Sequence, residues 1–137
     1  MRRVLALSLG LATAVAVLAA NAFGSPAATR TITIVHVTGG CHSWKVNAHV
    51  SPSAALTLRR GATLRVVDQD VDAHRLVQLA GPKIRLGGAM MMNHGKTLVF
   101  QKAGLYRFTT RVVEMAGMPE VKTIGPDHTL LLTVRVR

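Results

Sequence analysis

Short runs in which apolar and polar residues alternate extend from residue 31 to the end of the chain. The clearest are "TITIVHV", where isoleucines alternate with threonines, and "LLLTVRV" near the C-terminus. A period of two places the apolar side chains on one face of a β-strand. The apolar members of these runs are Ile32, Ile34, Leu56, Leu58, Leu64, Val66, Leu76, Leu79, Leu98, Phe100, Tyr106, Phe108, Leu130, Leu132, Val134 and Val136. The pattern predicts short strands throughout and no amphipathic helix of useful length.

The turns between these runs indicate the fold class. Arg60-Gly61 separates a run that ends at Leu58 from one that begins at Leu64, and we expect these two strands to form a hairpin. Lys102-Ala103-Gly104 is a second turn. We expect the hydroxyl of Tyr106, which follows it, to bond back to the neighbouring backbone, as in the tyrosine corner of β-sandwiches. The sequence therefore predicts an all-β, antiparallel Greek-key β-sandwich.

The N-terminal segment differs from everything that follows. Arg2 and Arg3 precede an apolar stretch that ends at Ala20-Asn21-Ala22. A charged start, an apolar stretch and small residues at its end are typical of a secretory signal peptide. We expect a signal peptide at residues 1–22, a single domain at residues 23–137, and a periplasmic or extracellular location for a protein that is not integral to the membrane once the signal is cleaved. A retained anchor is the alternative, since the stretch is near the lower length limit for crossing a bilayer.

The charge balance excludes some function classes. The chain has 17 lysines and arginines against 6 aspartates and glutamates, a formal net charge of +11. The arginines are scattered along the predicted strands, whereas a nucleic-acid surface needs clustered cations with interleaved aromatic residues. We expect a solvated basic face and no nucleic-acid partner, with attraction to an acidic envelope surface as the alternative. The few acidic residues and the lack of a Ser-His-Asp pattern also predict that the protein is not an enzyme.

The only cysteine, Cys41, lies in "GGCHSW", beside His42 and close to the only tryptophan, Trp44. An odd cysteine in an exported protein has no partner for an intramolecular disulfide. It is then a buried inert thiol, a link to another chain, or a metal ligand or reactive thiol. The glycine pair before it and the histidine after it favour the ligand or reactive thiol.

Three segments stand out: "LTLRRGATLRVVDQD", "VDAHRLVQL" and "TLVFQKAGLYRFTT". They resemble segments of the cupredoxins, the family of blue-copper β-sandwiches. The first is similar to the family's two strands around a basic glycine turn, the second to its loop that presents a copper histidine, and the third to its F-x-x-x-G-x-Y-x-F segment. With the last strand, the resemblance covers most of residues 31–137. It implies a cupredoxin-like fold, a copper cofactor, and His74 as a copper ligand.

One position departs from the family pattern. Thr110 stands where the resemblance places the cysteine ligand, so the usual Cys-x-His-x-Met loop is not intact. The thiolate that gives a blue site its colour is therefore missing from its place.

The resemblance also implies where the other ligands gather. In this topology the first strand runs toward the metal end of the sandwich, so the loop "TGGCHSW" carries Cys41 and His42 to the rim where His74 lies. A thiolate and imidazoles favour copper over hard cations. Neighbours on an extended chain point to opposite faces, so only one of Cys41 and His42 need reach the metal. The chain is also similar to a subgroup of small exported cupredoxin-like proteins with an early Cys-His-x-Trp segment.

The long loop at residues 110–128 is expected at the same rim. It contains Met115 and Met118, whose thioethers are candidates for a weak axial ligand. Both are equally candidates for core filling under the loop. Glu114 is a third candidate, suited to a harder site.

A second candidate site is "GGAMMMNHG", residues 87–95. Met90, Met91 and Met92 precede Asn93 and His94 in this segment. Thioethers are soft ligands that select copper(I). Because consecutive residues alternate in direction, at least one of the methionines is expected in the core.

The predicted function is copper binding by an exported cupredoxin-like protein that acts in copper handling or electron transfer in the cell envelope. The predicted metal ligands are Cys41, His42, His74, Met115 and Met118. A redox protein or a copper-accepting protein is the expected partner besides the ion itself. The alternative is a metal-free β-sandwich that acts as an interaction module of the envelope.

Overall fold

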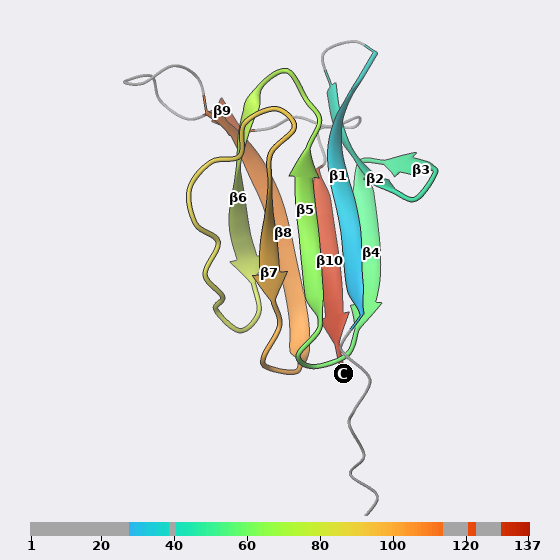
Figure 1. Ribbon diagram of the computed structural model, residues 1–137, viewed down its shortest axis with the longest axis vertical. Helices are drawn as coiled ribbons and strands as arrows, with labels where there is room; N and C mark the ends of the chain where they lie inside the picture. Colours follow the sequence, from blue (N-terminus) through green and yellow to red (C-terminus); the bar gives the residue numbers. More distant parts are fainter. Residues whose placement is uncertain (1–27, 39–40, 114–120, 123–129) are drawn as a thin grey trace, which may run out of the picture.

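The computed structural model describes residues 28–38, 41–113, 121–122 and 130–137, and these residues form strands and no helix (Figure 1). The strands build two sheets of five strands each. The first sheet has the order β3 (His49–Ser51), β2 (Cys41–Val46), β1 (Thr29–Val37), β5 (Thr63–Asp68) and β7 (Gly95–Val99). The second has the order β4 (Ser53–Leu58), β10 (Leu131–Val136), β8 (Gly104–Val113) and β6 (Ala73–Ala80), and β9 (Val121–Lys122) pairs with β8. The expected all-β sandwich is confirmed.

Both sheets are mixed, whereas the sequence suggested wholly antiparallel pairing. β1 pairs with β5 in parallel, and β4 pairs with β10 in parallel. The other strand pairs are antiparallel. Parallel neighbours cannot be joined by a tight turn, and here each parallel pair joins strands that are separated along the chain by other elements.

The predicted hairpin at Arg60-Gly61 is wrong. β4, which precedes this turn, belongs to the second sheet, and β5, which follows it, belongs to the first. The turn's amides bind outside a hairpin ladder: Arg60 N–H donates to the carbonyl of Arg137 at 2.8 Å, and Gly61 N–H donates to that of Phe100 at 2.8 Å. Crossing between sheets lets the apolar faces of β4 and β5 oppose each other, so both are buried in one core.

The alternating apolar residues fill the space between the sheets. The largest side chains that are fully buried include Trp44, Tyr106, Phe100 and Phe108. The rings of Phe100 and Tyr106 meet edge to face with centroids 4.9 Å apart, a favourable aromatic geometry. Burial of this aromatic cluster is a main source of hydrophobic stabilisation for a domain of this size.

The tyrosine corner is confirmed. The hydroxyl of Tyr106 donates a hydrogen bond to the carbonyl of Lys102 at 2.7 Å. The ring is buried, and the hydrogen bond satisfies the one polar atom that the ring takes into the core. This contact fixes the connection between β7 and β8 to the body of the sandwich.

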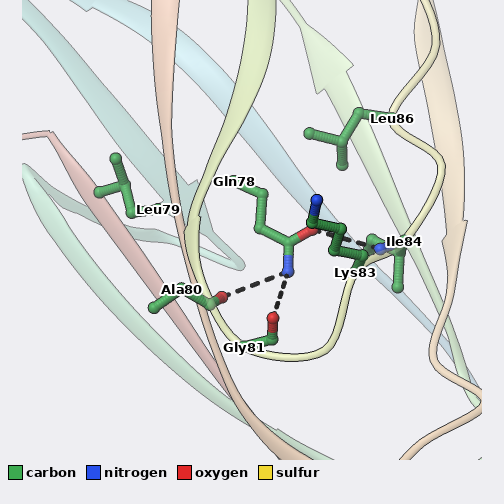
Figure 2. Close-up of a pocket in the computed structure, with 7 residues that line it drawn as sticks. All are labelled: Gln78, Leu79, Ala80, Gly81, Lys83, Ile84 and Leu86. Atoms are coloured by element: carbon green, nitrogen blue, oxygen red, sulfur yellow. Dashed lines mark hydrogen bonds between the residues drawn. The ribbon is translucent and has the colours of Figure 1, made fainter.

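A groove of about 330 Å³ lies at the far end of β6 from His74. Figure 2 shows the Gln78 amide at its centre, and this amide donates to the carbonyls of Ala80, Gly81 and Pro82 at 3.3, 3.2 and 2.8 Å. Ile84 N–H donates to the Gln78 carbonyl oxygen at 3.2 Å. Gln78 thus holds the loop after β6 in place. None of the residues that line the groove is a histidine, cysteine, aspartate or glutamate, so the groove offers no metal-binding cluster.

Within the described residues, no helix is long and apolar enough to cross a membrane. The expected signal peptide at residues 1–22 lies outside the described part of the chain.

Candidate metal centre

Three histidines and two aspartates meet at one end of the sandwich, where β1 and β5 end and β2 and β6 begin (Figure 1). They are His36 on β1, His42 on β2, Asp68 at the end of β5, Asp70 in the loop that follows, and His74 on β6. Both sheets and the loop between β5 and β6 therefore each supply part of one cluster.

His36 and His42 face each other across the β1–β2 pair. The register pairs Ile34 with Trp44 and His36 with His42. Because residues two apart share a face, the two histidines continue the core-facing rows of Ile34 and Trp44 out to the rim. Their rings meet edge to face with centroids 5.6 Å apart.

Asp68 and His74 join the two sheets. Asp68 follows Leu64 and Val66 on the buried face of β5 and is itself fully buried. Its Oδ2 lies 2.9 Å from Nδ1 of His74, which is also fully buried. Its Oδ1 accepts a hydrogen bond from Asp70 N–H at 3.0 Å. Both carboxylate oxygens are thus used, and the hydrogen bond to His74 fixes that ring.

Asp70 binds two histidines with one carboxylate. Its Oδ2 lies 2.6 Å from Nδ1 of His42, and its Oδ1 lies 3.3 Å from Nδ1 of His36. Burial raises the pKa of Asp70, but the hydrogen bond from His42 and the N–H groups of Asp72 and Val71 outweigh it and hold the pKa below its ordinary value of 3.8. Asp70 is therefore ionised at neutral pH and places a negative charge beside the two imidazoles.

These contacts determine which ring nitrogen of His42 and of His74 carries the lone pair. A neutral imidazole has one N–H and one lone pair, and a carboxylate at Nδ1 favours the proton on Nδ1. In both His42 and His74 the lone pair is then on Nε2. Nε2 of His74 is buried and has no hydrogen-bond partner among the described residues. The rings of His42 and His74 meet edge to face with centroids 4.9 Å apart.

This arrangement fits a metal ion. Histidines that ligate metals usually donate their other ring N–H to a carboxylate, which orients the ring and raises its basicity. His74 with Asp68 and His42 with Asp70 both show that pattern. A buried polar atom without a protein partner is uncommon and marks a place where a bound water or ion can complete its bonding. Imidazole nitrogen suits copper, zinc, iron and nickel, so the donor set is compatible with the copper that the sequence resemblance implies.

A second grouping overlaps with the first. Among the described residues, His36, His42 and Asp70 each offer a ligand atom, and these atoms lie within 4.8 Å of one another. Asp70 is therefore a possible ligand in its own right as well as an orienting group for His42.

The structure brings together two of the predicted ligands, His42 and His74. The backbone of Cys41 begins β2 and pairs with Val37, so Cys41 and His42 belong to a strand and not to the expected loop "TGGCHSW". Its side chain lies outside what the structure describes, as do Met115, Met118 and Glu114.

Sequence reasoning missed His36, Asp68 and Asp70. The Gly39-Gly40 pair in the sequence suggests a turn, and pairing the residues that flank it would have indicated His36 opposite His42. Asp68 continues the period-two row of Leu64 and Val66 as a polar residue in a buried position. Because a polar residue at a buried position needs a partner, the pattern could have indicated that Asp68 binds another polar group.

The position of the missing family cysteine is buried. Thr110 follows Tyr106 and Phe108 on the core-facing row of β8 and is fully buried. Its hydroxyl has no hydrogen-bond partner among the described residues. β8 therefore supplies a hydroxyl to this region, where the family pattern has a thiolate.

The methionine segment lies against the same cluster. Met90 and His74 exchange two backbone hydrogen bonds, at 2.7 and 2.9 Å. Met90 is buried, as expected for at least one of the methionines, whereas Met91 and Met92 are 61% and 51% exposed. Asp68 N–H also donates to the carbonyl of His94 at 2.8 Å, so the segment buttresses the backbone around both Asp68 and His74.

No family model matches the chain, and no curated protein matches it in sequence. Solved structures do resemble it. A purple cupredoxin from Nitrosopumilus maritimus has a TM-score of 0.50 at 14% identity, over 79% of this chain and 99% of that chain. A reduced copper(I) form of an amicyanin variant has a TM-score of 0.45 at 15% identity, over 80% of this chain and 82% of that chain. The likeness to the purple cupredoxin concerns the fold: the protein is a cupredoxin-like β-sandwich, as its sequence motifs predict.

Proposed function

We propose that the protein binds one copper ion at this rim through Nε2 of His74 and Nε2 of His42. The observation that carries the proposal is the Nε2 atom of His74, which is buried without a partner while Nδ1 is fixed by Asp68. The two buried carboxylates add to the argument, because a bound cation offsets negative charge that would otherwise be costly away from water.

The remaining ligands of the proposed site come from the sequence. Cys41 begins the strand that carries His42 and is a candidate thiolate ligand. Met115 and Met118 follow β8 along the chain and are candidate thioether ligands. When bound, copper would supply either a redox centre or a transferable cargo, and the protein's part is to hold and orient the imidazoles.

We assign the protein to copper handling in the cell envelope in preference to electron transfer. The envelope location rests on the N-terminal sequence. A cupredoxin-like fold supports a copper site, but the family's thiolate position on β8 holds Thr110. A fast electron-transfer site depends on a rigid thiolate ligand set, whereas a handling site depends on access from solvent, which the exposed His36 beside the buried pair provides.

The experiment is a copper titration of the purified protein. Copper(II) binding is followed by visible absorption, and copper(I) binding by competition with a coloured chelator, for the wild type and for His74→Gln and Cys41→Ser. His49→Gln is the matched control, since His49 is an exposed histidine opposite Val46, toward the other end of β2.

The proposal predicts one equivalent of copper for the wild type and for His49→Gln, and a loss of affinity of about 10-fold or more for His74→Gln. An intense thiolate band that disappears in Cys41→Ser would add Cys41 to the ligand set. No retained copper in either oxidation state would overturn the proposal and favour the metal-free interaction module.

A further inference from the structure

The three histidines of the rim form a graded series from solvent to core. The side chain of His36 is 43% exposed, that of His42 is 8% exposed, and that of His74 is fully buried. Successive rings touch edge to face, at centroid distances of 5.6 Å and 4.9 Å. The proposed copper site uses the inner two rings as ligands and gives His36 no ligand role.

Asp70 links the outer two members of the series. Its two carboxylate oxygens contact Nδ1 of His36 and Nδ1 of His42, at 3.3 Å and 2.6 Å. Neighbouring ligand atoms bound at about 2.0–2.2 Å to one metal ion lie about 3 Å apart, so the 3.3 Å between His36 Nδ1 and Asp70 Oδ1 is close to the spacing of two ligands on a shared ion. An imidazole nitrogen and a carboxylate oxygen are both ligands that copper(II) accepts.

The inner site needs a path from solvent. Nε2 of His74 is buried, and a bare cation that crosses a region of low dielectric without ligands is strongly disfavoured. An exposed imidazole beside an ionised carboxylate offers a first point of attachment, and the negative charge of the carboxylate attracts a cation at short range. Each later step to the next ring then exchanges one ligand for another over a short distance.

We propose that His36 and Asp70 form a solvent-facing capture site for copper, from which the ion passes by way of His42 to His74. No bond other than metal–ligand bonds forms or breaks, and the oxidation state of the ion does not change. This inference rests on the proposed function and assigns to His36 a kinetic role that the inner site does not require.

The test is stopped-flow binding of copper(II) to the purified protein, with His36→Gln compared with the wild type. Trp44 is the only tryptophan, is buried, and lies two residues from His42, so quenching of its fluorescence reports arrival of the ion. Dissociation is measured by mixing the loaded protein with an excess of a strong chelator. His49→Gln again controls for the loss of an exposed histidine elsewhere on the same sheet.

The proposal predicts that His36→Gln slows association about tenfold or more, because the ligand that first holds the ion is lost while the charge of Asp70 is unchanged. Because His36 is on the path and not in the final site, dissociation slows by the same factor, and the affinity and the absorption spectrum of the loaded protein stay unchanged. His49→Gln changes none of these quantities.

Two results would overturn the capture site alone: wild-type association and dissociation rates in His36→Gln, or a weakened affinity with an altered spectrum, which would make His36 a permanent ligand. A wild type that holds no copper would overturn the proposed function together with this inference. The equilibrium titration and the kinetics therefore separate the two failures.

Discussion

Asp68→Asn is the substitution that most sharply tests how Asp68 sets the tautomer of His74 for metal binding. Asp68 accepts the backbone N–H of Asp70 through Oδ1 and contacts His74 Nδ1 through Oδ2. An asparagine of the same shape keeps its carbonyl oxygen on the Asp70 N–H, because only the oxygen accepts that bond. Its amide group then faces Nδ1 of His74 and donates to it.

The donated hydrogen bond reverses the tautomer of His74. Nδ1 becomes the acceptor, so the proton moves to Nε2, and the lone pair that the metal requires is lost from the buried side of the ring. Partners that orient a metal-bound histidine typically contribute 10- to 100-fold in affinity, so we expect Asp68→Asn to weaken copper binding by about 1.4–2.7 kcal/mol.

The assay is a competition titration against a chelator of known affinity, with circular dichroism and urea unfolding of the metal-free protein to show that the variant folds. Asp72→Asn is the matched control, because Asp72 is an exposed carboxylate on the same loop and its loss changes the net charge equally. Equal copper affinities for Asp68→Asn and Asp72→Asn would refute the tautomer argument.

Three further predictions concern the scaffold and its charges. Phe108→Ala, in the fully buried aromatic cluster, should lower the free energy of unfolding in urea by about 3–5 kcal/mol, and a loss below about 1 kcal/mol would contradict the packing. Gly81→Ala should destabilise more than Gly61→Ala: both have a positive φ, but a Cβ at Gly81 would lie 2.5 Å from the carbonyl oxygen of Leu105, whereas nothing lies within 4 Å at Gly61. The pKa of Asp70 is lower in the folded state than its ordinary value of 3.8, so its contribution to stability is present above that pH and is lost as the pH falls through the folded pKa. The difference in the free energy of unfolding between the metal-free wild type and Asp70→Asn should therefore shrink as the pH drops below 3.8. A difference that is independent of pH would argue against this role.

The strands were predictable because burial of one face requires apolar residues at every second position of the sequence. Ile32 and Ile34, or Leu132 and Val134, are buried as their alternation predicts. Which strands pair was not predictable in the same way. The turn at Arg60-Gly61 has the local chemistry of a hairpin, yet it connects two different sheets, because that choice depends on which distant faces oppose each other.

Only part of the candidate site could be predicted from the sequence, for a related reason. His42 and His74 carry a recognisable family context, whereas Asp68 and Asp70 matter through contacts with residues 6 and 28 positions away along the chain. The spacing of these pairs follows no local rule, since it is set by the register of β1, β2 and β5 and by the connection to β6. His36 was accessible to sequence reasoning, but only through the symmetry of its hairpin.

The central claim is that copper lies against Nε2 of His74 and Nε2 of His42. A crystal of the copper-loaded protein, with anomalous difference density collected on both sides of the copper edge, tests it most directly. We expect a single strong copper peak within bonding distance of both Nε2 atoms, with Asp68 and Asp70 still bound to the opposite ring nitrogens. A peak only elsewhere, such as at Met91 and Met92, or none in a fully loaded crystal, would contradict it.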